Sequence, residues 1–101
     1  MKLNKRIILK KIEKNKSQLK KFGVKSLSLF GSYAINKQKK DSDIDFLVEF
    51  EKGRGKFEDL STLQITLEDM FKTKIDLVKP QNIREEIKPH IFEGKRYAAR
   101  I

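Results

Sequence analysis

The pair Gly31-Ser32 ends one apolar stretch of the chain, and the carboxylates Asp43 and Asp45 begin the next one. Each stretch has the alternation or the branched and aromatic content of a β-strand. Side chains alternate along a strand, so carboxylates two positions apart point to the same face. Such a pair suits a hard cation such as Mg²⁺, and a Gly-Ser turn opposite it can offer backbone N–H groups and a hydroxyl to a phosphate. The spacing therefore predicts a metal-nucleotide site for phosphoryl or nucleotidyl transfer.

A third carboxylate, Asp76, lies within the apolar segment 74–78. A lone acid there is costly unless it is paired, metal-bound or on an exposed edge. Three carboxylates at strand ends match a two-metal site, in which one cation activates the attacking oxygen and the other holds the triphosphate. The third carboxylate can bind a metal or act as the general base. The structural alternative for Asp76 is an edge-strand ion pair with Lys74 or Lys79.

The rest of the chain predicts helices around this segment. Apolar residues at helical spacing, Phe57, Leu60, Leu63, Leu67, Met70 and Phe71 among them, indicate the core-facing stripe of an amphipathic helix. The expected class is α/β or α+β, with about three or four strands. The elements expected are a helix over 4–21, a strand over 24–30, a short helical turn at 32–34 capped by Ser32, a strand over 44–50, a helix over 56–71, a strand over 75–78 and a last helix from Asn82.

Composition limits the function classes further. A length of 101 residues favours one domain over residues 1–101, and the absence of cysteine excludes disulfides, thiolate metal sites and a cysteine nucleophile. No apolar run approaches the roughly 18 residues of a membrane span. We therefore expect a cytoplasmic protein that does not contact the membrane.

The net charge of +10 is concentrated at the N-terminus. Residues 1–21 carry nine basic groups and one acid, 9 − 1 = +8, whereas the other 80 residues carry 15 basic and 13 acidic groups, 15 − 13 = +2. This basic helix could attract RNA or an acidic protein surface, or it could simply present a solvated lysine face.

Three segments, 29–34, 41–48 and 74–78, carry a resemblance to a known family. From about residue 22 to the C-terminus the chain resembles the minimal nucleotidyltransferase (MNT) domain of the DNA polymerase β-like nucleotidyltransferase superfamily. The resemblance implies a small mixed β-sheet flanked by helices, the polymerase β palm-like fold, with ATP and two Mg²⁺ ions at the Gly-Ser turn. It also implies roles for the site residues: Gly31 and Ser32 bind the triphosphate, Asp43 and Asp45 hold both cations, and Asp76 helps to activate the acceptor hydroxyl.

Small prokaryotic members of this family are often antitoxins paired with a helical HEPN-domain ribonuclease toxin. The resemblance thus implies an adenylyltransferase that transfers AMP from ATP to a toxin tyrosine and releases pyrophosphate, with the toxin encoded by a neighbouring gene. Three alternatives stay open: a small-molecule acceptor such as an aminoglycoside, a non-catalytic module that masks the toxin, and RNA binding through residues 1–21.

The chain departs from the family pattern directly after the Gly-Ser turn. Family members commonly have Arg-Gly where this chain has Ile35 and Asn36. Asparagine tolerates a left-handed backbone and can replace the glycine sterically. Isoleucine cannot replace the charge of the arginine, so we expect this departure to affect triphosphate affinity more than metal binding.

Overall fold

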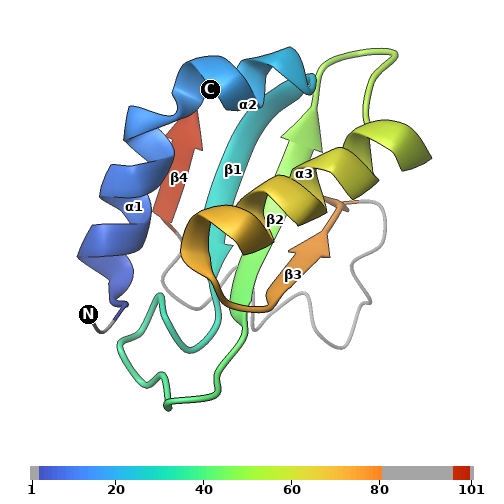
Figure 1. Cartoon of the computed structure of the whole chain (residues 1–101). Coiled ribbons are helices and arrows are strands. Elements are labelled where there is room, and N and C mark those ends of the chain that lie inside the picture. The colour runs from blue at the N-terminus through green and yellow to red at the C-terminus, as the bar shows by residue number, and fades with distance from the viewer. Residues whose placement is uncertain (1–2, 81–96, 101) are drawn as a thin grey trace.

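The computed structural model describes residues 3–80 and 97–100, and the helix expected from Asn82 lies outside them. Figure 1 shows helices on one face of a small β-sheet. Within the described ranges, no helix combines the length and the apolar character needed to cross a membrane. In chain order the elements are α1 (Lys5–Lys14), α2 (Lys16–Lys21), β1 (Val24–Phe30), β2 (Ile44–Phe50), α3 (Phe57–Phe71), β3 (Ile75–Val78) and β4 (Tyr97–Arg100).

The sheet has four strands in the order β3-β2-β1-β4. Strand β1 is antiparallel to both of its neighbours, whereas β2 and β3 are parallel. A parallel pair needs a crossover connection, which α3 provides. The expected small mixed sheet flanked by helices is therefore confirmed. Strand β4 was not expected, because four residues are too few for an alternating pattern and its place depends on pairing with β1.

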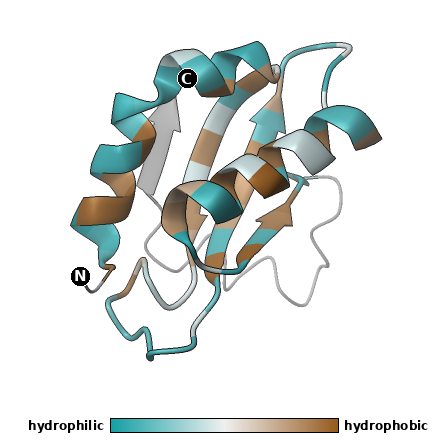
Figure 2. Ribbon diagram, in the orientation of Figure 1, coloured by the Kyte–Doolittle hydropathy of each residue, from teal (hydrophilic) through white to brown (hydrophobic). Residues whose placement is uncertain are grey.

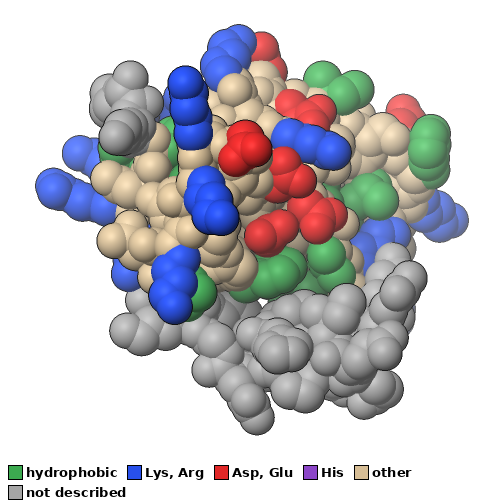
Figure 3. Space-filling view, turned by 90° about the horizontal axis from the view of Figure 1, so that it is seen from below, with side chains coloured by type: hydrophobic (Ala, Val, Ile, Leu, Met, Phe, Trp, Pro, Cys, Tyr) green, Lys and Arg blue, Asp and Glu red, His purple; other side chains and the backbone are tan. Residues whose placement is uncertain are grey.

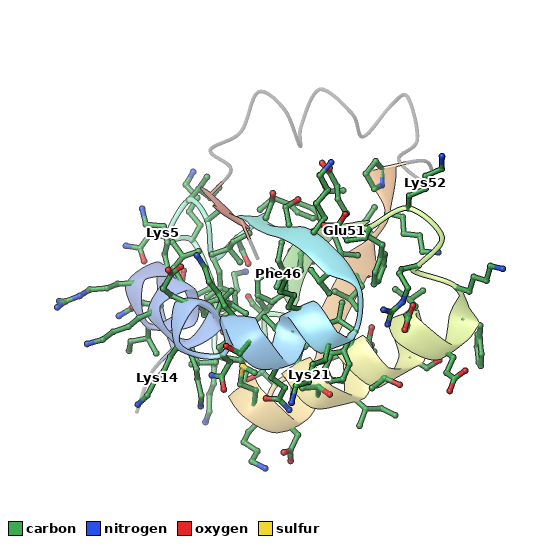
Figure 4. All side chains as sticks on the ribbon, turned by 90° about the horizontal axis from the view of Figure 1, so that it is seen from above. Lys5, Lys14, Lys21, Phe46, Glu51 and Lys52 are labelled. Carbon is green, nitrogen blue, oxygen red and sulfur yellow. The ribbon has the colours of Figure 1, made fainter. Side chains whose placement is uncertain are left out.

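The hydrophobic core lies between the helices and the sheet, where Figure 2 shows brown positions on the facing sides of both layers. Ile44, Phe46 and Val48 of β2 are buried in one cluster with Leu63 and Leu67 of α3. Figure 4 shows Phe46 in the interior of the molecule. Because strand side chains alternate, the intervening positions of β2, including the acids Asp45 and Glu49, point to the opposite face of the sheet.

The expectation of one continuous helix over 4–21 is wrong, because the helix breaks at Asn15. Asn15 leaves the helical region with φ −109° and ψ 18°. Its side-chain Nδ2 donates to the carbonyl of Lys11 at 2.8 Å, and its backbone N–H also reaches Lys11 and Ile12. Asparagine side chains compete with the helix for backbone groups in this way, which explains a break at a position that the apolar spacing does not mark.

The short helical turn expected after Ser32 is present as a single hydrogen-bonded turn, in which the N–H groups of Ala34 and Ile35 donate to the carbonyl of Gly31 at 3.1 and 3.3 Å. A smaller expectation differs from the structure. Phe57 does not belong to the buried stripe of α3, since it is 85% exposed at the first residue of that helix. The first turn of α3 extends beyond the layer that the sheet can cover.

An ion pair fixes the loop between β2 and α3. Arg54 donates to both carboxylate oxygens of Asp59 at 2.9 Å and to the carbonyl of Lys21 at 3.1 Å. The backbone N–H of Gly55 donates to Asp59 as well, at 3.0 Å. These donors, first of all the Arg54 guanidinium, lower the pKa of Asp59 to about 2. The pair therefore ties the loop to the end of α2.

We expect Asp59→Asn to lower the melting temperature at pH 7. The folded protein holds the pKa of Asp59 below its ordinary 3.8, so the stabilisation is present above about pH 4 and is lost as the pH falls toward 2. Circular dichroism melts of both proteins at pH 7 and pH 3 measure this difference. Asp69→Asn is the matched control, because Asp69 pairs with Lys72 on the exposed face of α3. An equal loss in both variants would contradict the loop-fixing role.

Candidate active site

The structure places the Gly-Ser turn and the D-x-D carboxylates on neighbouring strands. Gly31 directly follows β1, whose last residue, Phe30, pairs with Asp45 of β2 in antiparallel register. Asp43 lies one residue before β2. The long loop between the strands returns the chain to the same end of the sheet, so the two halves of the motif meet there.

Asp76 reaches the same end of the sheet through the parallel pairing of β2 with β3. Asp45 and Asp76 are direct partners in this register, and their side chains share a hydrogen bond. Asp45 is partly buried, whereas Asp76 is exposed. Figure 3 shows acidic side chains gathered at this end of the molecule, with Lys or Arg side chains beside them. The structure thus sets Asp45 beside Asp76 and places Asp43 near enough for its charge to act on Asp45.

The pKa of Asp45 shows how much negative charge is concentrated here. Burial, first of all, and then the charges of Asp76 and Asp43 together raise the pKa of Asp45 to about 6 from its ordinary 3.8. The hydrogen bond with Asp76 acts in the same direction. A carboxylate disfavoured by like charges is stabilised by any cation that comes between them.

Gly31 allows the Asp45 carboxylate to lie against the turn. Its φ is +76°, in the left-handed region, and a Cβ at this position would lie 2.2 Å from Oδ2 of Asp45. Only glycine meets both conditions without a shift of the backbone or of the carboxylate. The glycine of the motif is therefore required by the packing of the site as well as by the approach of a phosphate to the backbone.

A backbone hydrogen bond from β2 and side-chain contacts from α3 hold the start of β3 in place. The N–H of Ile44 donates to the carbonyl of Lys74 at 3.0 Å, which joins the segments that carry Asp45 and Asp76. From α3, Gln64 donates to the carbonyl of Ile75, and Glu68 accepts from the Ile75 N–H at 3.5 Å. The sequence interpretation did not find Gln64 and Glu68, and their spacing of four residues on a helix was the only signal available.

The two departures after the Gly-Ser turn have different consequences. Asn36 has φ +60°, which confirms that asparagine here adopts the left-handed conformation of a glycine. Ile35 is 46% exposed, so its side chain lies at the surface and does not belong to the core. Tyr33, in contrast, is 5% exposed and packs in the core.

The donor groups of this site fit a divalent cation shared with a phosphate. Among the described residues, no three His, Cys, Asp or Glu side chains stand together as a complete metal-binding group. Mg²⁺ is usually bound by one or two carboxylates, with water and substrate phosphates completing its coordination. The in-register pair of Asp45 and Asp76, with Asp43 close enough to act on the Asp45 charge, meets that requirement.

Sequence comparison identifies relatives over most of the chain. The family of the nucleotidyltransferase domain matches residues 8–98. A candidate protein adenylyltransferase of Methanocaldococcus jannaschii, MJ0435, is 44% identical over 74 residues, which are 73% of this chain and 78% of that protein. The protein adenylyltransferase MntA of Thermococcus cleftensis is 34% identical over 67 residues, 66% of this chain and 67% of MntA.

Solved structures share the same fold. A candidate minimal nucleotidyltransferase superposes with a TM-score of 0.75 at 25% identity, covering 92% of this chain and 94% of its own. One chain of a toxin–antitoxin complex crystallised with AMP-PNP gives a TM-score of 0.62 at 24% identity, over 93% of this chain and 72% of that one. At this level of identity the similarity shows a shared fold only. By its family match, its relatives and its fold, the chain belongs to the nucleotidyltransferase domain family, as a minimal nucleotidyltransferase.

Proposed function

We propose that this chain is an ATP- and Mg²⁺-dependent protein adenylyltransferase that acts as the antitoxin of a toxin–antitoxin pair in the cytoplasm. The observation that carries the proposal is the pairing of Asp45 with Asp76 at the end of the sheet where Gly31 makes room for the Asp45 carboxylate. Relatives named as protein adenylyltransferases support the donor, and a toxin–antitoxin complex of the same fold solved with AMP-PNP supports both a nucleotide and a protein partner.

The residues of the site divide the reaction between them. The turn at Gly31 and Ser32 binds the triphosphate through backbone N–H groups and the Ser32 hydroxyl. Asp43 and Asp45 hold the cations, with Asp76 as a further ligand or as the base. When bound, Mg²⁺ offsets the charge of the triphosphate and of the leaving pyrophosphate.

The transfer forms one phosphorus–oxygen bond and breaks another. The hydroxyl oxygen of an acceptor tyrosine attacks the α-phosphorus of ATP, and the bond from that phosphorus to the bridging oxygen breaks as pyrophosphate leaves. Asp76, which is exposed near the start of β3, accepts the phenolic proton. The products are a tyrosine esterified with AMP and free pyrophosphate.

The basic helices offer a surface for the partner. Arg6, Lys10 and Lys14 of α1 are exposed, and Figure 4 shows Lys14 and Lys21 at the outside of the molecule. Such a surface attracts an acidic one and raises the rate of encounter. We propose that the partner is a HEPN-type toxin encoded by a neighbouring gene and that α1 and α2 guide its approach.

The test uses ATP labelled at the α-phosphate, Mg²⁺ and the purified product of the neighbouring gene. We expect label to move onto the partner and the partner's ribonuclease activity to fall. The double variant Asp43→Asn, Asp45→Asn should transfer no label, because it lacks the negative charge that holds the cations. Electrophoresis of the labelled proteins measures the transfer, and mass spectrometry of the partner identifies the modified residue.

Each contrary outcome points to one alternative. Tight binding and inhibition of the partner without label, equal for wild type and double variant, would replace transfer by masking of the toxin. Label on an aminoglycoside in the absence of any protein acceptor would indicate a small-molecule acceptor. Salt-sensitive RNA binding lost after neutralisation of the exposed lysines of α1, without transfer to any protein, would indicate an RNA-binding protein.

A further inference from the structure

A cavity of about 820 Å³ lies at the end of the molecule where α1 begins and α3 ends. The loop after the Gly-Ser turn forms its third side. Its wall includes Tyr33 and Phe71, whose side chains belong to the core beneath the helices. Gly31 and the three carboxylates do not line it. The cavity is therefore separate from the site described above, although Tyr33 directly follows Ser32 in the chain.

Among the residues that the structure describes, the charged side chains lining this cavity are all positive. Lys39 and Lys40 come from the loop and Lys72 comes from the end of α3, and none of these described lining residues carries a carboxylate. Lys72 donates to Asp69 at 2.8 Å, but both side chains are more than three-quarters exposed, so this pair contributes little and can be exchanged for another anion. Lysine ammonium groups at the mouth of a cavity favour an anionic ligand, above all a phosphate.

A buried hydrogen-bond acceptor in the wall indicates that the ligand also carries a hydrogen-bond donor. The side-chain oxygen of Gln38 is buried and accepts no hydrogen bond from the described residues. The Gln38 amide nitrogen has only long contacts, at 3.4 Å to Asn36 and 3.5 Å to Leu3. A buried acceptor is normally satisfied, so a ligand toward which the Gln38 side chain turns, and which donates to this oxygen, would remove an unfavourable feature of the cavity wall. The rings of Tyr33 and Phe71 add an apolar wall.

We propose that this cavity binds a mononucleotide, with the phosphate on Lys39 and Lys72 and the base against the aromatic wall. An exocyclic amino group of the base would donate to the side-chain oxygen of Gln38. The volume lies within the range of about 300–1,000 Å³ that small-molecule sites occupy. The N–H of Lys37 donates to the carbonyl of Ser32 at 2.9 Å, so a ligand held by this loop would also fix the Gly-Ser turn.

The test measures AMP binding by calorimetry in EDTA at low salt. Without a divalent cation the carboxylates repel a nucleotide, so binding under these conditions reports the lysine-lined cavity. We expect Lys39→Gln, Lys72→Gln to weaken AMP binding by at least about tenfold, because two charge-assisted hydrogen bonds are lost. Gln38→Met should weaken AMP binding and leave inorganic phosphate binding unchanged. The matched control is Lys25→Gln, Lys52→Gln, which removes two exposed lysines outside the cavity.

The outcome separates this inference from the proposed function. Absence of AMP binding, equal binding by the Lys39, Lys72 variant, or equal affinity for inorganic phosphate and AMP would each overturn the inference. None of these three results would alter the expected label transfer in Mg²⁺.

Discussion

Asp45→Asn is expected to raise the melting temperature of the metal-free protein at neutral pH while it removes AMP transfer. The rise of the Asp45 pKa from 3.8 to about 6 corresponds to roughly 3 kcal/mol of unfavourable free energy in the charged carboxylate. Solvent around the partly buried side chain reduces this figure, so we expect a gain of about 1–2 kcal/mol in the free energy of unfolding. For a chain of this length that is a rise on the order of 5–10 °C, measured by calorimetry in EDTA.

The sign of the pH dependence follows from the direction of the shift. The folded state binds more protons at Asp45 than the unfolded state between about pH 4 and pH 6, so wild-type stability falls as the pH rises through that range. An amide does not titrate, and the advantage of the variant should therefore vanish near pH 4. A stability difference that persisted at pH 4 would show that packing, rather than charge, is responsible.

Addition of Mg²⁺ supplies the second control. A cation bound between the carboxylates stabilises the folded wild type by mass action, whereas the variant has lost one of its ligands. We expect the wild-type melting temperature to rise with Mg²⁺ concentration and the variant to respond weakly. Equal responses of the two proteins would remove Asp45 from the cation site.

Gly31→Ala is expected to lower AMP transfer by about a hundredfold or more and to destabilise the fold by about 2 kcal/mol. The new methyl group would lie 2.2 Å from Oδ2 of Asp45 and would require the left-handed φ of +76°. Relief of this contact displaces either the carboxylate that holds the cation or the backbone that binds the triphosphate. Label transfer to the partner measures the first effect, and denaturant unfolding measures the second.

Gly53→Ala separates the backbone effect from the contact. Gly53 has nearly the same φ, +81°, but a Cβ there would meet nothing within 4 Å. It should lose only the stability that the left-handed conformation costs, and transfer should be unchanged. The Gly31→Ala penalty should also shrink in an Asp45→Ala background, because the contacts with Oδ2 and Cγ are then absent and only the Cβ at 3.2 Å remains. Equal penalties at Gly31 and Gly53 would show that contact with Asp45 is unimportant.

The candidate site residues stand out in the sequence because each carries a local signal. A Gly-Ser turn after one strand and two acids before the next are visible as spacing, and an acid within an apolar segment marks Asp76. The same spacing predicted β1, β2, β3 and α3, with bounds close to those observed. The break at Asn15 escaped prediction because asparagine is tolerated within helices as well as at their ends.

The sequence by itself determined β1, β2, β3 and α3 and singled out the candidate site residues, since these depend on alternation and spacing over a few neighbouring positions. Only the tertiary structure decided that Asp45 lies opposite Phe30 on one side and Asp76 on the other, and that β4 pairs with β1. Register between strands depends on the packing of side chains far apart in the chain. The raised pKa of Asp45 and the need for glycine at position 31 both follow from that register, which no local pattern records.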